Sequence, residues 1–269
     1  MTIKKNILIL ATNSDFSQNL SPFFFKNNWN LYGTSRSSVN ASNFIKVFTC
    51  DFSDENSVTN AIKKIRETKI VFDLILNCVG ILDPIGYFKN SNCEDWKKNI
   101  VINSLNPIYL IKEILSLQLN KNKTNVIFFS GSGTNDPAIN YSAYTSSKIL
   151  LIKLTEILDA EYKNVIFTIL GPGVVDTKIH QQTFRASAKA GENLDKLKEY
   201  YNNHDKFTSY NKIYDFIDWV IRNKKNIVGG RNFSILNDNI NSTSLINHLK
   251  KDSNFFKLRR FGNNYLNKD

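Results

Sequence analysis

Short apolar runs alternate along the chain with longer segments in which apolar residues recur at helical spacing. The runs that fit buried strands cover residues 7–11, 29–34, 45–49, 72–78, 125–130, 165–170 and 232–236. Apolar strands separated by helices are typical of βαβ units whose parallel sheet is covered on both faces. The pattern therefore predicts a doubly wound α/β fold with a mostly parallel, seven-stranded sheet.

Helical spacing is clearest in three of the intervening segments, residues 58–65, 100–117 and 143–158, which should pack on the sheet. Residues 177–207 are polar and weakly periodic, so we expect a helical excursion from the sheet there. No repeat or linker interrupts residues 1–240, which predicts a single domain. Residues 241–269 follow the last strand, and we expect this tail to be docked on the domain or to form an oligomer contact.

Composition narrows the class of protein. The chain has 269 residues, of which 42% are hydrophobic, enough for a sizeable core. Its net charge of +11 comes mostly from lysines dispersed among asparagines, which indicates compositional bias rather than a nucleic-acid surface. Cys50, Cys78 and Cys93 lack metal-like spacing, so we predict no metal site and a reducing compartment. The apolar run at residues 6–10 is too short for a signal peptide or membrane span, and we expect a cytoplasmic protein with no membrane partner.

The candidate chemistry lies in Tyr144-Thr145-Ser146-Ser147-Lys148. This spacing places a phenol and an ammonium on the same face of a helix, one turn apart. The ammonium favours the phenolate and should lower the pKa of the tyrosine, which then exchanges a proton closer to neutral pH. The pair alone is weak evidence, because a tyrosine beside a solvated lysine occurs in many helices.

The surrounding sequence makes the interpretation specific. A buried strand at residues 125–130 ends in the hydroxyl of Ser130, and a small polar loop leads from it to the Tyr144 helix. Three further motifs occur in order along the chain: Asn77-Cys78-Val79-Gly80, then Trp96 with Asn103 and Pro107, then Gly171-Pro172-Gly173-Val174-Val175-Asp176-Thr177. With these motifs, residues 5–236 resemble the short-chain dehydrogenase/reductase family, whose members have a Rossmann-type fold and a nicotinamide cofactor.

The resemblance implies catalytic roles. Tyr144 would exchange a proton with the substrate oxygen, and Lys148 would lower the tyrosine pKa and bind the nicotinamide ribose. Ser130 would hold the substrate oxygen where negative charge develops, with Ser132 as the alternative in the same loop. Asn103 would keep a water in place between Lys148 and solvent.

The cofactor end departs from the family pattern, because the turn after the first strand has no glycine. Ala11, Asp15 and Ser17 stand at the three glycine positions. A turn is still feasible, because Asn and Asp tolerate left-handed backbone angles. We expect the affinity of this turn for a diphosphate to be reduced. Arg36, at the end of the second strand, suits a 2′-phosphate and favours NADP (NADPH) over NAD. Asp51 would border the adenine, and Thr177 the nicotinamide. The other cofactor contacts implied are Asn13, Ser14, Phe16, Phe52, Asn77, Gly80, Pro172, Gly173, Val175, Tyr144 and Lys148.

The sequence limits the substrate only broadly. Polar residues after the Pro-Gly turn, such as Lys178, His180 and Arg185, favour a small polar carbonyl or alcohol. The Ser-Gly-rich loop resembles that of bacterial family members of surface-sugar biosynthesis, which implies a keto-sugar or a nucleotide-linked sugar. The resemblance also implies a homodimer or homotetramer built on the Asn103 and Tyr144 helices. The alternative function is a catalytically weak dinucleotide sensor or scaffold, which the missing glycines favour.

Overall fold

The computed structural model describes residues 4–37, 42–116 and 123–261. Its sheet has seven parallel strands in the order β3-β2-β1-β4-β5-β6-β7, so the predicted doubly wound, Rossmann-type α/β fold is confirmed. The strands, in chain order, are β1 (Lys5–Leu10), β2 (Trp29–Ser35), β3 (Phe44–Thr49), β4 (Leu74–Asn77), β5 (Thr124–Phe129), β6 (Val165–Gly171) and β7 (Asn232–Ser234).

Helices cover both faces of the sheet and create two cores. One core packs β-strand side chains against α2 (Glu55–Glu67), α4 (Asn106–Leu115) and α5 (Ser142–Glu161). The other packs them against α1 (Asp15–Lys26), α8 (Tyr210–Arg222) and α9 (Lys225–Val228). β5 is buried along its whole length, and its last four residues, 126–129, are all apolar rather than alternating with polar residues.

The predicted helix at residues 100–117 is three elements in the structure. α3 (Cys93–Ile100) passes into a π-helical turn (Val101–Leu105) and then into α4, which ends at Leu115. Leu117, the predicted end, lies outside the described residues. The π-helical turn was not predicted, because one extra residue per turn changes the apolar spacing too little to be recognised in the sequence.

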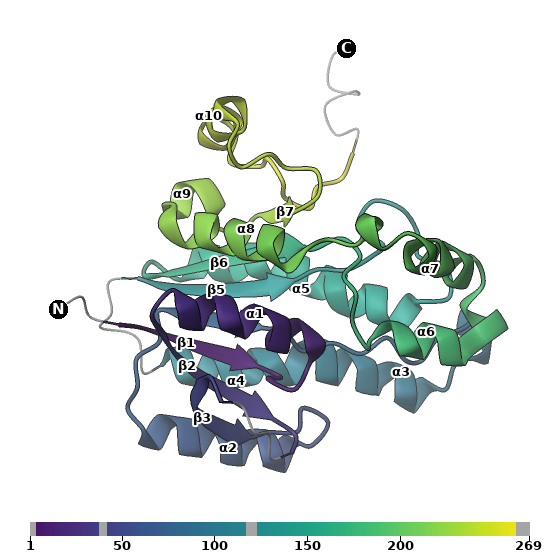
Figure 1. Cartoon of the computed structure of the whole chain (residues 1–269), viewed down its shortest axis with the longest axis horizontal. Helices are drawn as coiled ribbons and strands as arrows, with labels where there is room; N and C mark the ends of the chain where they lie inside the picture. Colours follow the sequence, from purple (N-terminus) through teal and green to yellow (C-terminus); the bar gives the residue numbers. More distant parts are fainter. Residues whose placement is uncertain (1–3, 38–41, 117–122, 262–269) are drawn as a thin grey trace.

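The excursion expected at residues 177–207 contains two α-helices, α6 (His180–Ala186) and α7 (Glu192–Asn202). Two short 3-10 turns, Ser187–Ala190 and His204–Lys206, follow these helices. Figure 1 shows α6 and α7 beyond the carboxyl ends of the strands, at the right of the view. The excursion therefore stands over the edge of the sheet at which ligands bind in such folds.

The described part of the C-terminal tail packs on the same domain. α10 (Thr243–Lys251) contributes Leu249 to the core beside α8. The buried guanidinium of Arg231 donates to the main-chain oxygens of Leu249 (2.8 Å) and Asp252 (3.1 Å), and to that of Phe255. Arg259 makes two contacts with the Glu156 carboxylate on α5, at 2.6 and 2.9 Å. In the described parts of the chain, no helix has the length and hydrophobicity needed to cross a membrane.

Candidate active site

A cleft of about 1770 Å³ opens at the carboxyl ends of the strands. It adjoins the ends of β1 and β4, where the strand order reverses, as ligand sites do in open α/β sheets. Small-molecule sites usually measure roughly 300–1,000 Å³, so the cleft has room for a dinucleotide and a second molecule. Of the catalytic and cofactor-binding residues predicted from the sequence, all but Asn103 line it.

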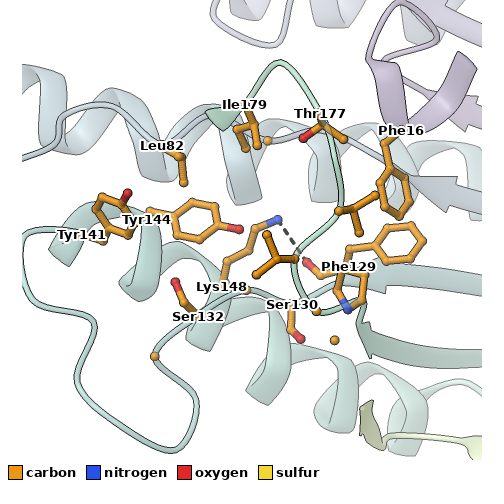
Figure 2. Close-up of a pocket in the computed structure, with 18 of the residues that line it drawn as sticks. Phe16, Leu82, Phe129, Ser130, Ser132, Tyr141, Tyr144, Lys148, Thr177 and Ile179 are labelled. Carbon is orange, nitrogen blue, oxygen red and sulfur yellow. Dashed lines mark hydrogen bonds between the residues drawn. The ribbon is translucent and has the colours of Figure 1, made fainter. Parts of the chain in front are cut away.

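Tyr144 and Lys148 lie side by side on α5 and face this cleft (Figure 2). Lys148 is 5% exposed. Its Nζ donates to the Phe129 carbonyl at 3.0 Å and lies 5.6 Å from the centre of the Tyr144 ring. The main chain of Gly131 passes directly against the tyrosine, since a Cβ there would clash with the phenol oxygen and lie 2.6 Å from Cε1. The pair is thus held between β5 and the loop that follows it.

Burial controls the proton affinity of both groups. It raises the pKa of Tyr144 to about 12, with a smaller contribution from Tyr141, and it lowers the pKa of Lys148 to about 8. The pKa of Tyr144 is therefore raised, not lowered as its spacing from Lys148 predicted. The physical reason is that the Lys148 ammonium donates to the Phe129 carbonyl, while desolvation of the phenolate dominates.

The two candidate serines lie on different sides of the loop after β5. Ser130 is 6% exposed, and its hydroxyl oxygen lies 3.1 Å from the position that a Cβ on Gly171 would take. In Figure 2 the Ser130 hydroxyl points away from Tyr144, whereas Ser132 lies on the tyrosine side of the loop. The strand-end position that favoured Ser130 in the sequence thus directs its hydroxyl toward β6 rather than toward the phenol.

Asn103 is buried in the π-helical turn and organises a neighbouring loop. Its Nδ2 donates to the Ile81 carbonyl and to Asn99 Oδ1, both at 2.9 Å, and its Oδ1 accepts from the Ile81 amide at 2.8 Å. Asn99, one helical turn earlier, donates to the Asp83 carbonyl at 2.7 Å, a role that its spacing from Asn103 could have suggested. The side-chain amide of Asn103 thus bonds other groups of the protein. The water expected between Asn103 and Lys148 stays a prediction.

The glycine-free turn after β1 is closed by side-chain hydrogen bonds. Ala11 takes the left-handed backbone conformation (φ 62°), not Asn13 or Asp15, the residue types expected to tolerate it. Ser17 Oγ donates to the Ala11 carbonyl at 2.8 Å, and Ser14 caps α1 by accepting from the Ser17 amide at 3.1 Å. The hydroxyls of Ser14 and Ser17 therefore stabilise this turn by hydrogen bonds.

Asp15, at the start of α1, is paired across the cleft with Lys178. Its Oδ1 lies 2.8 Å from the Lys178 ammonium, and its Oδ2 accepts from the Lys178 amide at 2.5 Å. The carboxylate, which by its charge alone would oppose a diphosphate, is therefore neutralised by a residue of the loop after β6. The sequence did not reveal this pair, because its members lie 163 positions apart.

The end of the cleft at Arg36, where the family resemblance implies the adenosine, is positively charged. Arg36 and Lys98 both line it, although Lys98 was not predicted from the sequence. Burial tends to raise the pKa of Asp51, but hydrogen bonds from Ser53 and the charges of Arg36 and Lys98 outweigh it, so the net pKa is lowered. Asp51 is thus a carboxylate beside two cations, a donor and acceptor set that fits a phosphorylated adenosine.

The wall beside Tyr144 is apolar. Leu82, Tyr141 and Ile179 belong to a small hydrophobic cluster that includes Tyr144, and Figure 2 shows them around it. Polar residues of the segment after the Pro-Gly turn also line the cleft, as expected, but two of them bond main-chain groups of the protein. Gln182 Oε1 accepts from the amides of Leu82 (2.8 Å) and Asp83 (2.9 Å), and the His180 ring bonds the Val175 carbonyl at 2.9 Å.

Comparison with known proteins agrees with this architecture. A family model for short chain dehydrogenase matches residues 27–188. A 3-ketodihydrosphingosine reductase of Bos taurus is 29% identical over 143 residues, which cover 52% of this chain and 43% of the reductase. The chain thus spans less than half the length of this relative. Among solved structures, ElxO with NADP bound has a TM-score of 0.70 (21% identity, 87% of this chain and 97% of that one). A 4-hydroxyisoleucine dehydrogenase complexed with NADH has a TM-score of 0.72 and 21% identity, with 86% of this chain and 96% of that chain covered.

The match to the family model covers more than half of the chain. The protein therefore belongs to the short chain dehydrogenase family, as its motifs suggested.

Proposed function

We propose that this chain is an NADP(H)-dependent oxidoreductase that interconverts a carbonyl and an alcohol by tyrosine acid/base catalysis. The observation that carries the proposal is the placement of Tyr144 beside the buried ammonium of Lys148 in the cleft at the carboxyl edge of the sheet. The names of similar proteins support it, since they include a ketone reductase and structures with NADP or NADH.

Each catalytic side chain has a role that its chemistry allows. Tyr144 Oη donates its proton to the carbonyl oxygen in reduction, and its raised pKa keeps the phenol protonated and ready to donate at neutral pH. Lys148 leaves the Phe129 carbonyl, approaches the phenol oxygen and favours the phenolate that forms. A bound nicotinamide supplies or accepts the hydride. Thr177 and Lys148 line the part of the cleft that would hold it.

The cofactor preference rests on the two cations at the adenosine end. We predict that Arg36→Ala weakens NADPH binding about tenfold or more and changes NADH binding less than about twofold, because only NADPH carries the 2′-phosphate. Quenching of tryptophan fluorescence during titration with each nucleotide measures both affinities. Arg66→Ala is the matched control, since Arg66 is an exposed arginine that pairs with Glu113 outside the cleft. An equal effect of Arg36→Ala on NADH and NADPH would contradict the preference for NADP.

The geometry of the loop after β5 supports Ser132, rather than Ser130, as the donor to the substrate oxygen. We predict that Ser132→Ala lowers kcat about a hundredfold, as loss of an oxyanion donor does, while Ser130→Ala lowers it less than about threefold. The two alanine variants control for each other, because both remove one hydroxyl from the same loop. Steady-state kinetics under saturating NADPH distinguish them, and the reverse order would restore the assignment to Ser130.

For the substrate, the apolar wall of Leu82, Tyr141 and Ile179 supports a carbonyl that carries an apolar group on one side. A small keto-sugar or nucleotide-linked sugar is the second candidate, favoured by Arg185 and Lys196, which also line the cleft. A panel of apolar ketones, 3-oxoacyl thioesters and keto-sugars, assayed by NADPH oxidation, separates the two classes. Turnover of keto-sugars alone would reverse this order.

A catalytically weak dinucleotide sensor or scaffold is the second candidate function, favoured by the ion pair of Asp15 with Lys178 at the cofactor turn. It predicts nucleotide binding with no turnover of any member of the panel.

We further propose a homodimer or homotetramer built on the helices that carry Asn103 and Tyr144. Three exposed apolar residues support such a contact: Leu105 at the end of the π-helical turn, Tyr109 on α4 and Ile157 on α5. Sedimentation velocity of Tyr109→Lys should show dissociation, and an unchanged mass distribution would argue for another interface.

A further inference from the structure

The ion pair between Asp15 and Lys178 lies where a dinucleotide's diphosphate would lie if the proposed function holds. Asp15 is the first residue of α1, at the turn after β1, and Lys178 follows Thr177 in the loop after β6. Both line the cleft that Arg36 and Tyr144 also line. In the sheet, β1, which leads to Asp15, lies between β2, which leads to Arg36, and β5, whose following loop contacts Tyr144. The pair therefore occupies the passage between the two halves of the cofactor site.

The pair imitates the interaction of a cation with a phosphate. One carboxylate accepts from both nitrogens of Lys178, the amide at 2.5 Å and the ammonium at 2.8 Å. A diphosphate offers the same kind of acceptor with more negative charge, and helix N-termini favour such anions. Two like charges at close range repel one another in water, and more strongly near a protein surface. An unneutralised Asp15 would therefore oppose the cofactor.

The structure allows the ammonium to change partners without moving the loop. The Lys178 side chain is 76% exposed, while that of Asp15 is 17% exposed, so the lysine can swing and the carboxylate stays. The loop itself is fixed by other contacts. Tyr201 donates to Asp176 Oδ1 at 3.1 Å, and the Tyr210 hydroxyl donates to the Asp176 carbonyl at 3.2 Å. The loop backbone is thus anchored independently of the ion pair.

We propose that Lys178 is a diphosphate-binding residue and that Asp15 is its internal competitor. In the free protein Asp15 holds the lysine. When the dinucleotide binds, the ammonium moves from the Asp15 carboxylate to the diphosphate. It then stabilises the diphosphate charge, as the main-chain amides of a glycine-rich turn would. The competition sets a lower affinity for the cofactor than the cleft would otherwise have.

The test compares two probes in fluorescence titrations. NADPH contains the diphosphate, whereas adenosine 2′-monophosphate reaches only the adenosine end. We expect Asp15→Asn to tighten NADPH binding about three- to tenfold and Lys178→Met to weaken it about tenfold, with binding of adenosine 2′-monophosphate changed less than about twofold in both. Glu94→Gln is the matched control, because it removes one carboxylate from an exposed ion pair with Lys97, outside the cleft.

Each outcome decides the proposal. If Asp15→Asn weakens NADPH binding, or if neither variant changes it, the pair is only structural and the proposal is overturned. If wild type binds NADPH too weakly to measure while Asp15→Asn binds it, the competitor role is supported. If adenosine 2′-monophosphate binds but NADPH does not in any variant, this inference fails while the adenosine site stands. If no variant binds either probe, the proposed cofactor function fails together with it.

Discussion

Replacing Tyr144 with phenylalanine is expected to reduce turnover about 10³-fold while leaving NADPH affinity within about twofold of wild type. The phenol oxygen is the only proton donor that the proposed mechanism uses, so its loss removes general acid catalysis but not the binding surface. Among the described residues no protein hydrogen bond to this hydroxyl is found. The substitution should therefore leave the free energy of unfolding unchanged or slightly higher, since it removes a polar group from a desolvated site.

The measurement pairs single-turnover kinetics, on a panel substrate that wild type reduces, with an NADPH titration and a urea unfolding curve. Tyr141→Phe is the control, because Tyr141 is a neighbouring phenol whose hydroxyl bonds the Thr183 side chain at 2.6 Å. Its loss should affect stability more than the chemical step. Full activity of Tyr144→Phe would show that this phenol is not the acid and would favour the sensor interpretation.

The fold was predictable because it depends on the period of apolar residues, which is a local property of the sequence. β5 is buried throughout and β6 is buried up to its last residue, and both strands consist mostly of apolar residues. The weakest prediction concerned residues 235–236, because Ile235 is fully buried yet lies beyond β7, where the chain turns through hydrogen bonds to Ser234. Burial alone does not distinguish a strand from the turn that follows it.

The candidate site was predictable where one motif fixes one position, as Tyr144 and Lys148 do on a single helix. The direction of a side chain in a loop was not. Ser130 and Ser132 have the same chemistry in the sequence, and only the path of the chain past Gly131 separates them. Ion pairs between distant segments, such as Asp15 with Lys178, could not be predicted, because a single sequence contains no signal that links the two residues.

Lys148 offers a test in which activity and stability should move in opposite directions. Its pKa falls from 10.5 in water to about 8 in the folded protein, because burial disfavours the ammonium. Below pH 8 the lysine is charged in both states, and its burial then destabilises the fold by about 3 kcal/mol. Between pH 8 and 10.5 the unfolded chain binds more protons than the folded one, so this cost diminishes as pH rises and vanishes above 10.5.

We therefore expect Lys148→Met to raise the free energy of unfolding at pH 7 by about 2 kcal/mol, after about 1 kcal/mol is subtracted for the lost hydrogen bond to Phe129. The gain should disappear between pH 8 and 10.5, which urea unfolding of both proteins across this range measures. Turnover of the same variant should fall about a hundredfold.

In wild type, turnover should fall as pH rises through about 8, because the ammonium that favours the phenolate is lost. Lys148→Arg should move that fall to higher pH, since a guanidinium keeps its charge. Two results would show that the buried ammonium is not the group that titrates. One is a Lys148→Met variant less stable than wild type at pH 7, and the other is a Lys148→Met variant whose turnover still falls as pH rises through about 8. A more stable but inactive variant would show that the cleft keeps a destabilising charge for the sake of the reaction.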